Sequence, residues 1–335
     1  MRADAGAAPA RTQLAADRVT YVTVGADGDG QRVDNFLLKI ARGVPKSHVY
    51  RVVRSGEVRV NRGRVGVDTR LKAGDELRVP PMRVAPAAPP PPRLAPAAMP
   101  PILFEDEHLM AVDKPAGLAA HGGSGIAHGL IEQVRAARPH QPFLELAHRL
   151  DRETSGILLL AKSRRALVNL HQQLREGGVD KRYLALVKGD WVNDRQHVKA
   201  ALTKYVTRDG ERRVAVDHDD GVPSHTVFNL RQRFGAFSLL EAELKTGRTH
   251  QIRVHLAHLG FPILGDDKYG DFELNKRAAR GELEPARGQR FGRMFLHAYA
   301  TRFAHPVGGQ PLELVAPLPR DCEDLLRVLE RAGAL

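Results

Sequence analysis

One acidic residue stands between two arginines in the segment His148-Arg149-Leu150-Asp151-Arg152. The apolar run Ile157-Leu158-Leu159-Leu160-Ala161 follows and predicts a buried strand. A loop at the end of a rigid strand positions a reactive side chain well, and neighbouring cations keep a carboxylate ionised. We therefore predict that Asp151 is a catalytic carboxylate. The alternative is a surface ion pair that merely precedes a strand.

A second group of functional side chains lies in residues 245–255. Gly247 permits a tight turn, and Arg248 then lies where the spacing of Ile252 and Leu256 predicts a helix. An arginine at such a turn can bind a phosphate or a carboxylate through paired N–H groups. This segment therefore predicts an anion-binding group.

The charge of the chain is concentrated in one short segment. The 335 residues carry a formal net charge of +12, with 51 Lys and Arg against 39 Asp and Glu. Residues 31–83 hold 13 of the basic and 5 of the acidic residues, whereas residues 102–335 hold 34 and 30. This concentration predicts binding to a polyanion such as nucleic acid. A face of merely solvated charges is the alternative.

Composition divides the chain into four segments. Residues 1–30 are rich in Ala, Gly and Asp without a sustained period, which predicts a disordered N-terminal tail. Residues 84–101 contain eight prolines, which disfavour helix and sheet and predict an extended linker. We expect the linker to separate a small basic domain, residues 31–83, from a large domain, residues 102–335.

The small domain shows the pattern of two helices, a strand and a turn. Helical periods follow Asp34 and Lys46, residues 57–61 alternate like a strand, and Gly74-Asp75 predicts a turn. Together with Arg32-Val33-Asp34 and Pro45-Lys46-Ser47, this order resembles the S4 RNA-binding domain. Such a basic face holds phosphates without reading bases. The expected RNA-binding residues are Lys46, Ser47, Arg51, Arg54 and Arg59.

The large domain mixes strands and helices without regular alternation. The predicted strands cover residues 156–161, 182–187 and 237–244, and the predicted helices run from Ser163 to Gly177, over 249–258 and over 321–332. Irregular mixing of this kind is typical of α+β domains. We predict a mostly antiparallel mixed sheet flanked by helices and loops.

Five segments of the large domain together resemble the RluA-type family of pseudouridine synthases. They are Lys114 to Gly117, His148 to Gly156, Lys181 to Tyr183, Gly247 to Arg253 and Arg293 to Ala298, in the order of the family's motifs. Within the family, an S4 domain before this core is typical of enzymes that act on 23S ribosomal RNA. The resemblance implies that the chain isomerises specific 23S rRNA uridines to pseudouridine after flipping the nucleotide out of its stack. Two large-subunit types share this domain order and act on different uridines.

The resemblance also implies roles for individual residues. Asp151 is then the essential carboxylate, and it either attacks the ribose or takes a ribose proton to give a glycal; the sequence leaves both routes open. Arg248 would pair with Asp151, and Tyr183 would stack on the uracil. Leu296 would pack beside the base. The expected contacts with the RNA backbone near the target are Arg149 and Arg152.

Several classes of site are not expected. Isomerisation needs no cofactor or metal, and the sequence contains neither a glycine-rich phosphate loop nor clustered metal ligands. His148 is expected to fix its loop, and His250 and His255 are expected to be structural. One cysteine, Cys322, cannot form an internal disulfide or a cysteine-based zinc site.

The location and the partners follow from the same features. No run approaches the roughly 18 to 20 apolar residues of a membrane span, and the N-terminus lacks the apolar core of a signal peptide. We expect a cytoplasmic protein that binds ribosomal RNA, does not bind membranes and, by family resemblance, is a monomer. A non-catalytic RNA-binding ribosome assembly factor would explain the charge, but not the joint presence of Asp151, Tyr183 and Arg248. A glycoside hydrolase normally needs two acids, and this segment adds only Glu153.

Overall fold

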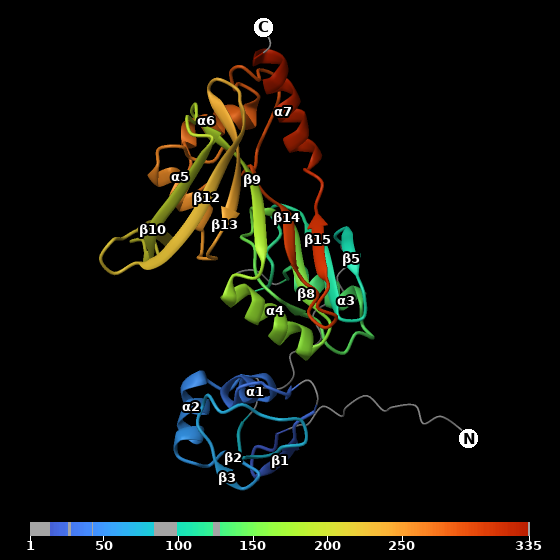
Figure 1. The fold of residues 1–335 in the computed structure, drawn as a ribbon. Helices are drawn as coiled ribbons and strands as arrows, with labels where there is room; N and C mark the ends of the chain where they lie inside the picture. Colours follow the sequence, from blue (N-terminus) through green and yellow to red (C-terminus); the bar gives the residue numbers. More distant parts are fainter. Residues whose placement is uncertain (1–13, 26–27, 42, 84–98, 123–127, 334–335) are drawn as a thin grey trace, which may run out of the picture. The chain divides into compact units, whose positions relative to one another are not determined.

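The computed structural model describes residues 14–25, 28–41, 43–83, 99–122 and 128–333. The chain divides between Ala97 and Ala98 into two compact units, drawn in blue and in green to red in Figure 1. Each unit has a hydrophobic core of its own. The two units are therefore described separately.

In the small unit, two helices share a core with a four-stranded antiparallel sheet. The helices are α1 (Val33–Ile40) and α2 (Lys46–Arg54), and the strands are β1 (Thr20–Thr23), β2 (Arg59–Val60), β3 (Gly63–Arg64) and β4 (Glu76–Val79). The strand order is β1-β4-β2-β3. Leu37 of α1, Val49 of α2 and Leu77 of β4 are all fully buried in one cluster. Burial of these side chains leaves the basic residues of α2 on the outside.

Strand β1 lies inside the segment that we predicted to be a disordered tail, so this prediction is wrong for Thr20–Thr23. All four residues pair with β4, and Val22 enters the core. The Ala-, Gly- and Asp-rich composition of residues 1–30 masked the strand signal of residues 19–24, which are all β-branched or aromatic. Residues 1–13 of the predicted tail and 84–98 of the predicted linker lie outside the described residues.

The described part of the large unit is built on an 11-stranded sheet. Its strands are β5 (Ile102–Glu105), β6 (Leu109–Lys114), β7 (Glu145–Leu146), β8 (Ser155–Ala161), β9 (Asp180–Lys188), β10 (Arg195–Val206), β11 (Arg212–Val216), β12 (Val222–Arg233), β13 (Phe237–Leu244), β14 (Leu296–Ala304) and β15 (Pro311–Val315). The order is β11-β10-β12-β13-β9-β14-β8-β6-β5, with β15 beside β14 and β7 beside β8. The named strands pair antiparallel, apart from the parallel pair of β14 and β8. The predicted α+β fold is therefore confirmed.

Helices lie against both ends of this sheet (Figure 1). They are α3 (Leu130–Ala137), α4 (Arg164–Glu176), α5 (Gln251–His258), α6 (Phe272–Arg280) and α7 (Arg320–Gly333). Helix α4 contacts β8, whereas α5 contacts β10, β11 and β12. As predicted, the Ser163 hydroxyl accepts the amide of Ala166 and begins α4, and Gly177 ends it in a left-handed conformation. None of the described helices is long and apolar enough to cross a membrane.

The parallel contact between β8 and β14 requires a glycine. Gly156 pairs with Ala298 and has φ +109°, a backbone conformation that L side chains rarely adopt. A Cβ atom at this position would overlap the backbone of Ala298. Because Asp151 lies five residues earlier in the chain, this close approach fixes the strand that follows the candidate catalytic residue.

We predict that Gly156→Ala destabilises the large unit by at least about 4 kcal/mol, since it adds a backbone clash to an unfavourable φ. Gly177→Ala is the matched control, because Gly177 also has a positive φ (+77°) but has open space where a Cβ would lie. The control should cost only about 1 to 2 kcal/mol. Urea unfolding followed by fluorescence of Trp191, the one tryptophan of the chain and a core residue of the large unit, measures both. Equal losses in the two variants would contradict this account of the strand contact.

Candidate active site

Asp151 lies in the loop that joins β7 to β8. The buried Lys114 fixes this loop through hydrogen bonds to backbone carbonyls. The Lys114 ammonium, at the end of β6, donates to the carbonyls of Pro115 and Leu118 (both 2.8 Å) and of Arg152 (3.1 Å). The Gly117 amide also donates to the Arg152 carbonyl, at 2.9 Å. Burial lowers the pKa of Lys114 to about 8, against the raising effect of the nearby Glu153 and Asp151 charges. The Lys114–Gly117 segment thus holds the backbone one residue after Asp151.

The Asp151 carboxylate faces a buried arginine. Its Oδ2 atom lies 3.4 Å from an Nη atom of Arg253, whose side chain is only 3% exposed. The Asp266 carboxylate accepts two hydrogen bonds from the same guanidinium, at 2.7 and 2.6 Å, and also accepts the amides of Lys268 and Tyr269. Burial alone lowers the pKa of Arg253, but Asp266 and the Asp151 charge outweigh burial and raise it. A third carboxylate, that of Asp267, lies 3.1 Å from the guanidinium, so Arg253 is a fixed cation that contacts Asp151, Asp266 and Asp267.

The prediction that Arg248 pairs with Asp151 is wrong in this structure. Arg248 lies in the exposed turn before α5, where its Nε atom is 3.4 Å from the Pro223 carbonyl. Arg253 takes the place beside Asp151 because it lies on the first turn of α5 and faces inward. A signal was available in the sequence: Arg253 lies next to Ile252 and three residues before Leu256, and an arginine on an apolar helix face needs an acidic partner.

A cleft of about 570 Å³ opens beside Asp151. Its apolar lining includes Tyr183 of β9 and Leu296 of β14, which are 7% and 3% exposed. The cationic side chains that line the cleft outnumber Asp151, its one acidic residue. They are Arg149, Arg175, Lys181, Lys245, Arg248 and Arg253. A buried apolar floor together with an excess of cations fits a planar, uncharged base attached to a phosphate backbone.

Most of the predicted substrate residues come together in this cleft. Tyr183, Leu296, Arg149 and Arg248 line it with Asp151. Arg152 does not line it: its guanidinium binds Glu153 at 2.6 Å, and its side chain is 57% exposed. Sequence reasoning missed the cations that α4 and the neighbouring strands contribute. They are Arg175, Lys181 and Lys245.

Tyr183 offers the cleft a neutral phenol. Burial raises the pKa of its hydroxyl, and the charge of Asp151 raises it further. The ring therefore presents an aromatic face and an O–H group, without a charge, at the wall of the cleft.

Two histidines near the cleft have structural partners. The His148 Nε2 atom accepts the Leu159 amide at 3.2 Å and so ties the Asp151 loop to β8, as predicted. Burial, together with the Lys181 charge, lowers the pKa of His148 to about 4, so this ring is neutral near pH 7 and can accept. His255 lies within 2.8 Å of the Ser224 hydroxyl and 3.0 Å of the Thr226 hydroxyl. Its pKa is also lowered to about 4, mainly by burial.

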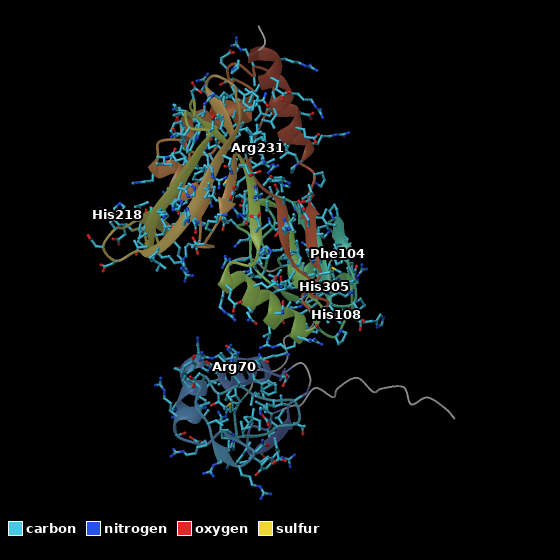
Figure 2. All side chains as sticks on the ribbon, viewed as in Figure 1. Arg70, Phe104, His108, His218, Arg231 and His305 are labelled. Atoms are coloured by element: carbon cyan, nitrogen blue, oxygen red, sulfur yellow. The ribbon has the colours of Figure 1, made fainter. Side chains whose placement is uncertain are left out.

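Across the part of the chain that the structure describes, no group of three or more His, Cys, Asp or Glu side chains is arranged to hold a metal ion. Figure 2 labels His108 and His305, whose rings lie 6.1 Å apart. His305 pairs with Asp106 at 2.8 Å, and Asp106 also accepts the amides of His108 and Leu109. These side chains close the turn between β5 and β6.

The predicted RNA-binding residues of the small unit lie on its surface, mostly along one helix. Lys46, Ser47, Arg51 and Arg54 line a shallow hollow along α2 together with Tyr50 and Ser55. Lys46 and Arg54 lie 5.4 and 5.8 Å from the centre of the Tyr50 ring. Arg59 lines a neighbouring hollow with Arg62 and Arg78. The four α2 residues Lys46, Ser47, Arg51 and Arg54 are called the α2 face below.

The sequence is similar to known families over both units. Residues 108–258 match the family model described as RNA pseudouridylate synthase, and residues 31–77 match the S4 domain. Over 318 residues the chain is 46% identical to the protein named ribosomal large subunit pseudouridine synthase C of Salmonella typhimurium strain LT2 and of Escherichia coli strain K12. These alignments cover 94% of this chain and 98% of each relative.

Solved structures show the same likeness. The human RNA pseudouridylate synthase domain containing 4 superposes with a TM-score of 0.57 at 26% identity, covering 71% of this chain and 96% of that one. The human RNA pseudouridylate synthase domain containing 1 superposes with a TM-score of 0.51 at 25% identity, covering 68% and 94%.

We predict that Asp266→Asn destabilises the large unit at pH 7 by about 3 to 5 kcal/mol, because it leaves the buried Arg253 charge without its main partner. Burial alone raises the pKa of Asp266, but Arg253 and the two backbone amides lower it overall. A carboxyl with a lowered folded-state pKa stabilises the fold above its unfolded pKa of about 3.9, and this contribution is lost as the pH falls through the folded value.

The difference in the free energy of unfolding between wild type and Asp266→Asn should therefore become smaller below about pH 4. Asp267→Asn is the control, since Asp267 contacts the same guanidinium at 3.1 Å but its side chain is 50% exposed. Urea unfolding at a series of pH values measures both variants. A loss for Asp266→Asn no larger than that for Asp267→Asn at pH 7 would refute the central role given to this pair.

Proposed function

The chain belongs to the RNA pseudouridylate synthase family, and from this premise we propose that it isomerises uridines of 23S ribosomal RNA to pseudouridine with Asp151 as the catalytic carboxylate. The resemblance to this family and to the S4 domain, predicted from the sequence, is confirmed. The observation that carries the proposal is the position of Asp151, beside buried Arg253 and at the edge of a cleft with an aromatic and aliphatic wall.

The isomerisation breaks the C1′–N1 bond of the nucleotide, turns the uracil within the site and joins C5 to C1′. The proton lost from C5 is balanced by the proton gained at N1, so no cofactor enters the reaction. Asp151 takes part through one of two routes, attack on the ribose or removal of a ribose proton. Both routes need a carboxylate that points at the sugar, and the ion pair with Arg253 orients the Asp151 carboxylate.

The base is held by the apolar part of the cleft. Tyr183 stacks on the uracil, and Leu296 packs beside it. The target uridine leaves its stack to reach this floor, because Tyr183 and Leu296 are both more than nine-tenths buried. The neutral hydroxyl of Tyr183 is then available to assist the transfer of the C5 proton.

The RNA backbone is held by cations in both units. Arg149 and Arg248 lie at the cleft and bind phosphates next to the flipped nucleotide. Arg152 lies outside the cleft lining and contacts the RNA backbone further along the strand. The α2 face and Arg59 add contacts that do not depend on the base sequence.

The finer assignment is to the synthase C type. The relatives at 46% identity carry that name, and the segments 43–47, 152–156 and 267–271 favour it over the synthase D type, which has the same domain order. We further propose that the protein is a monomer in the cytoplasm that does not bind membranes, in keeping with a ribosomal RNA substrate and a single cysteine.

We predict that Asp151→Asn lowers turnover by at least about 1,000-fold, because the amide can neither attack nor take a proton. The measurement is tritium release from 23S rRNA transcripts that carry 5-tritiated uridine. The affinity for RNA should stay within a few fold of wild type, since Asp151 adds no attraction to phosphates. Asp267→Asn serves as the control for loss of a nearby acid. Substantial release by Asp151→Asn, or no release by wild type on any ribosomal RNA, would contradict the proposal and favour a binding factor.

We predict that alanine at Lys46, Arg51 and Arg54 together weakens RNA binding and flattens its salt dependence. Loss of three phosphate contacts should reduce the slope of log affinity against log salt by about 2 to 3. A variant with alanine at Lys276, Arg277 and Arg280, on α6 of the large unit, removes the same charge as a control. Binding titrations at several salt concentrations compare the two. Equal slopes for both variants would rule out the α2 face as an RNA-binding surface.

A further inference from the structure

His250 has an unusual backbone conformation at the edge of the cleft. It precedes α5 with φ +54° and ψ +19°, in the left-handed region that few residues other than glycine occupy. Among the described residues only Asn61 and Arg62, both in the small unit, share a positive φ without being glycine. His250 lines the cleft, and its side chain is only 14% exposed. Residues in strained backbone conformations cluster at functional sites, so the contacts of the His250 side chain are described next.

The imidazole is held on one side by a chain of hydrogen bonds. The Val214 amide of β11 donates to the Tyr269 hydroxyl oxygen at 2.9 Å. The Tyr269 oxygen lies 2.8 Å from His250 Nδ1. Because the Val214 amide already occupies one acceptor site of that oxygen, its own proton is free to point at Nδ1. The opposite arrangement would leave the Tyr269 proton without an acceptor among the hydrogen bonds of the described residues.

These two hydrogen bonds determine which nitrogen of His250 carries the proton. If Nδ1 accepts from Tyr269, a neutral imidazole must carry its proton on Nε2. Nε2 lies 3.8 Å from Asp151 Oδ2. That distance is longer than a hydrogen bond, but catalytic contacts often shorten when substrate binds.

Arg253 and His250 approach the same oxygen of Asp151. The Arg253 Nη atom lies 3.4 Å from Oδ2, and His250 Nε2 lies 3.8 Å from it. Neither of these contacts involves Oδ1. When substrate binding shortens both contacts, Oδ2 lies between two N–H groups, which fixes the orientation of the carboxylate and leaves Oδ1 to face the ribose.

We infer that His250 is a positioning residue for Asp151, held as the neutral Nε2–H tautomer by Tyr269, so that it and Arg253 together fix Oδ2 and present Oδ1 to the substrate. The inference rests on the proposed function, from which Asp151 takes its role. Tyr269 also contacts the second partner of the Asp151 carboxylate, because its ring centre lies 5.2 Å from the Arg253 guanidinium. Tyr269 therefore supports both His250 and Arg253.

The charges around His250 favour this neutral form. Burial lowers the pKa of His250, and Arg253 of α5 and Lys268 of the following loop lower it further. Asp151 and Asp266 act in the opposite direction, and the overall shift is downward. A second proton would have to sit on Nδ1, where it would meet the Tyr269 proton. The tautomer is thus supported by geometry and electrostatics together.

A pair of substitutions separates positioning from a purely structural role. Glutamine carries its amide nitrogen three bonds from Cβ, as imidazole carries Nε2, so His250→Gln keeps a donor that can reach Asp151. Asparagine is one bond shorter and reaches only the Tyr269 side. Asparagine adopts the left-handed backbone conformation more readily than glutamine does, so a role limited to the turn would favour His250→Asn.

We expect the two variants to rank in opposite orders for stability and for chemistry. His250→Asn should be at least as stable to heat as His250→Gln, yet lose about 100-fold in the single-turnover rate of tritium release, whereas His250→Gln should lose less than about tenfold. Affinity for RNA should be unchanged in both. His258→Gln, at an exposed position at the end of the same helix, should match wild type. If His250→Asn equals or exceeds His250→Gln in rate, the inference is wrong.

The tautomer is tested directly by ¹⁵N NMR of the histidine side chains, with His250→Gln used to assign the signal. Wild type should show an unprotonated Nδ1 and a protonated Nε2, and Tyr269→Phe should give a mixture of tautomers. A protonated Nδ1 in wild type would overturn the inference. Failure of the inference and failure of the proposed function give different results. Inactivity of wild type on ribosomal RNA would refute the proposed function, whereas an active wild type with the wrong order of variants would refute only the role of His250.

Discussion

The arrangement of the large unit around its reactive carboxylate depends on one buried cation, the Arg253 guanidinium. A charge that is 97% removed from solvent must be paired, and Asp266 pairs with it through two short hydrogen bonds. The guanidinium also contacts Asp267, and its other Nη atom lies 3.4 Å from Asp151. Since Asp266 is itself held by the backbone amides of the loop after it, the charge links α5, that loop and the segment before β8.

The sheet positions the remaining residues of the site. β8, which follows the Asp151 loop, lies parallel to β14, and β14 lies antiparallel to β9. These three neighbouring strands bring Leu296 and Tyr183 to the same wall as Asp151, although the three residues are far apart in the chain. Lys114 and Gly156 then prevent the loop from shifting, one through carbonyl contacts and the other through a close backbone approach. The backbone of the Asp151 loop is thus supported from two directions.

Local patterns predicted the elements whose signals lie within the element itself. The apolar run of β8, the capped helix α4 and the closing helix α7 were visible in the sequence. Strand β1 was missed although its residues are β-branched or aromatic, because the composition of the whole segment 1–30 is that of a disordered tail. Arg253 rather than Arg248 is the partner of Asp151, because Arg253 lies on the inward side of α5 whereas Arg248 lies in the exposed turn before it; the apolar neighbours of Arg253 in the helix were the local signal for this. The contributions of Arg175 and Lys181 to the cleft likewise arise from tertiary packing.

A crystal structure of the Asp151→Asn variant bound to a 23S rRNA fragment with a target uridine tests the central claim most directly. The account predicts a flipped uridine in the cleft, with its ring on Tyr183, its ribose against the side chain of residue 151 and Arg253 still bound to Asp266. A uridine that stays stacked in the RNA, or one bound with its ribose out of reach of residue 151, would contradict it.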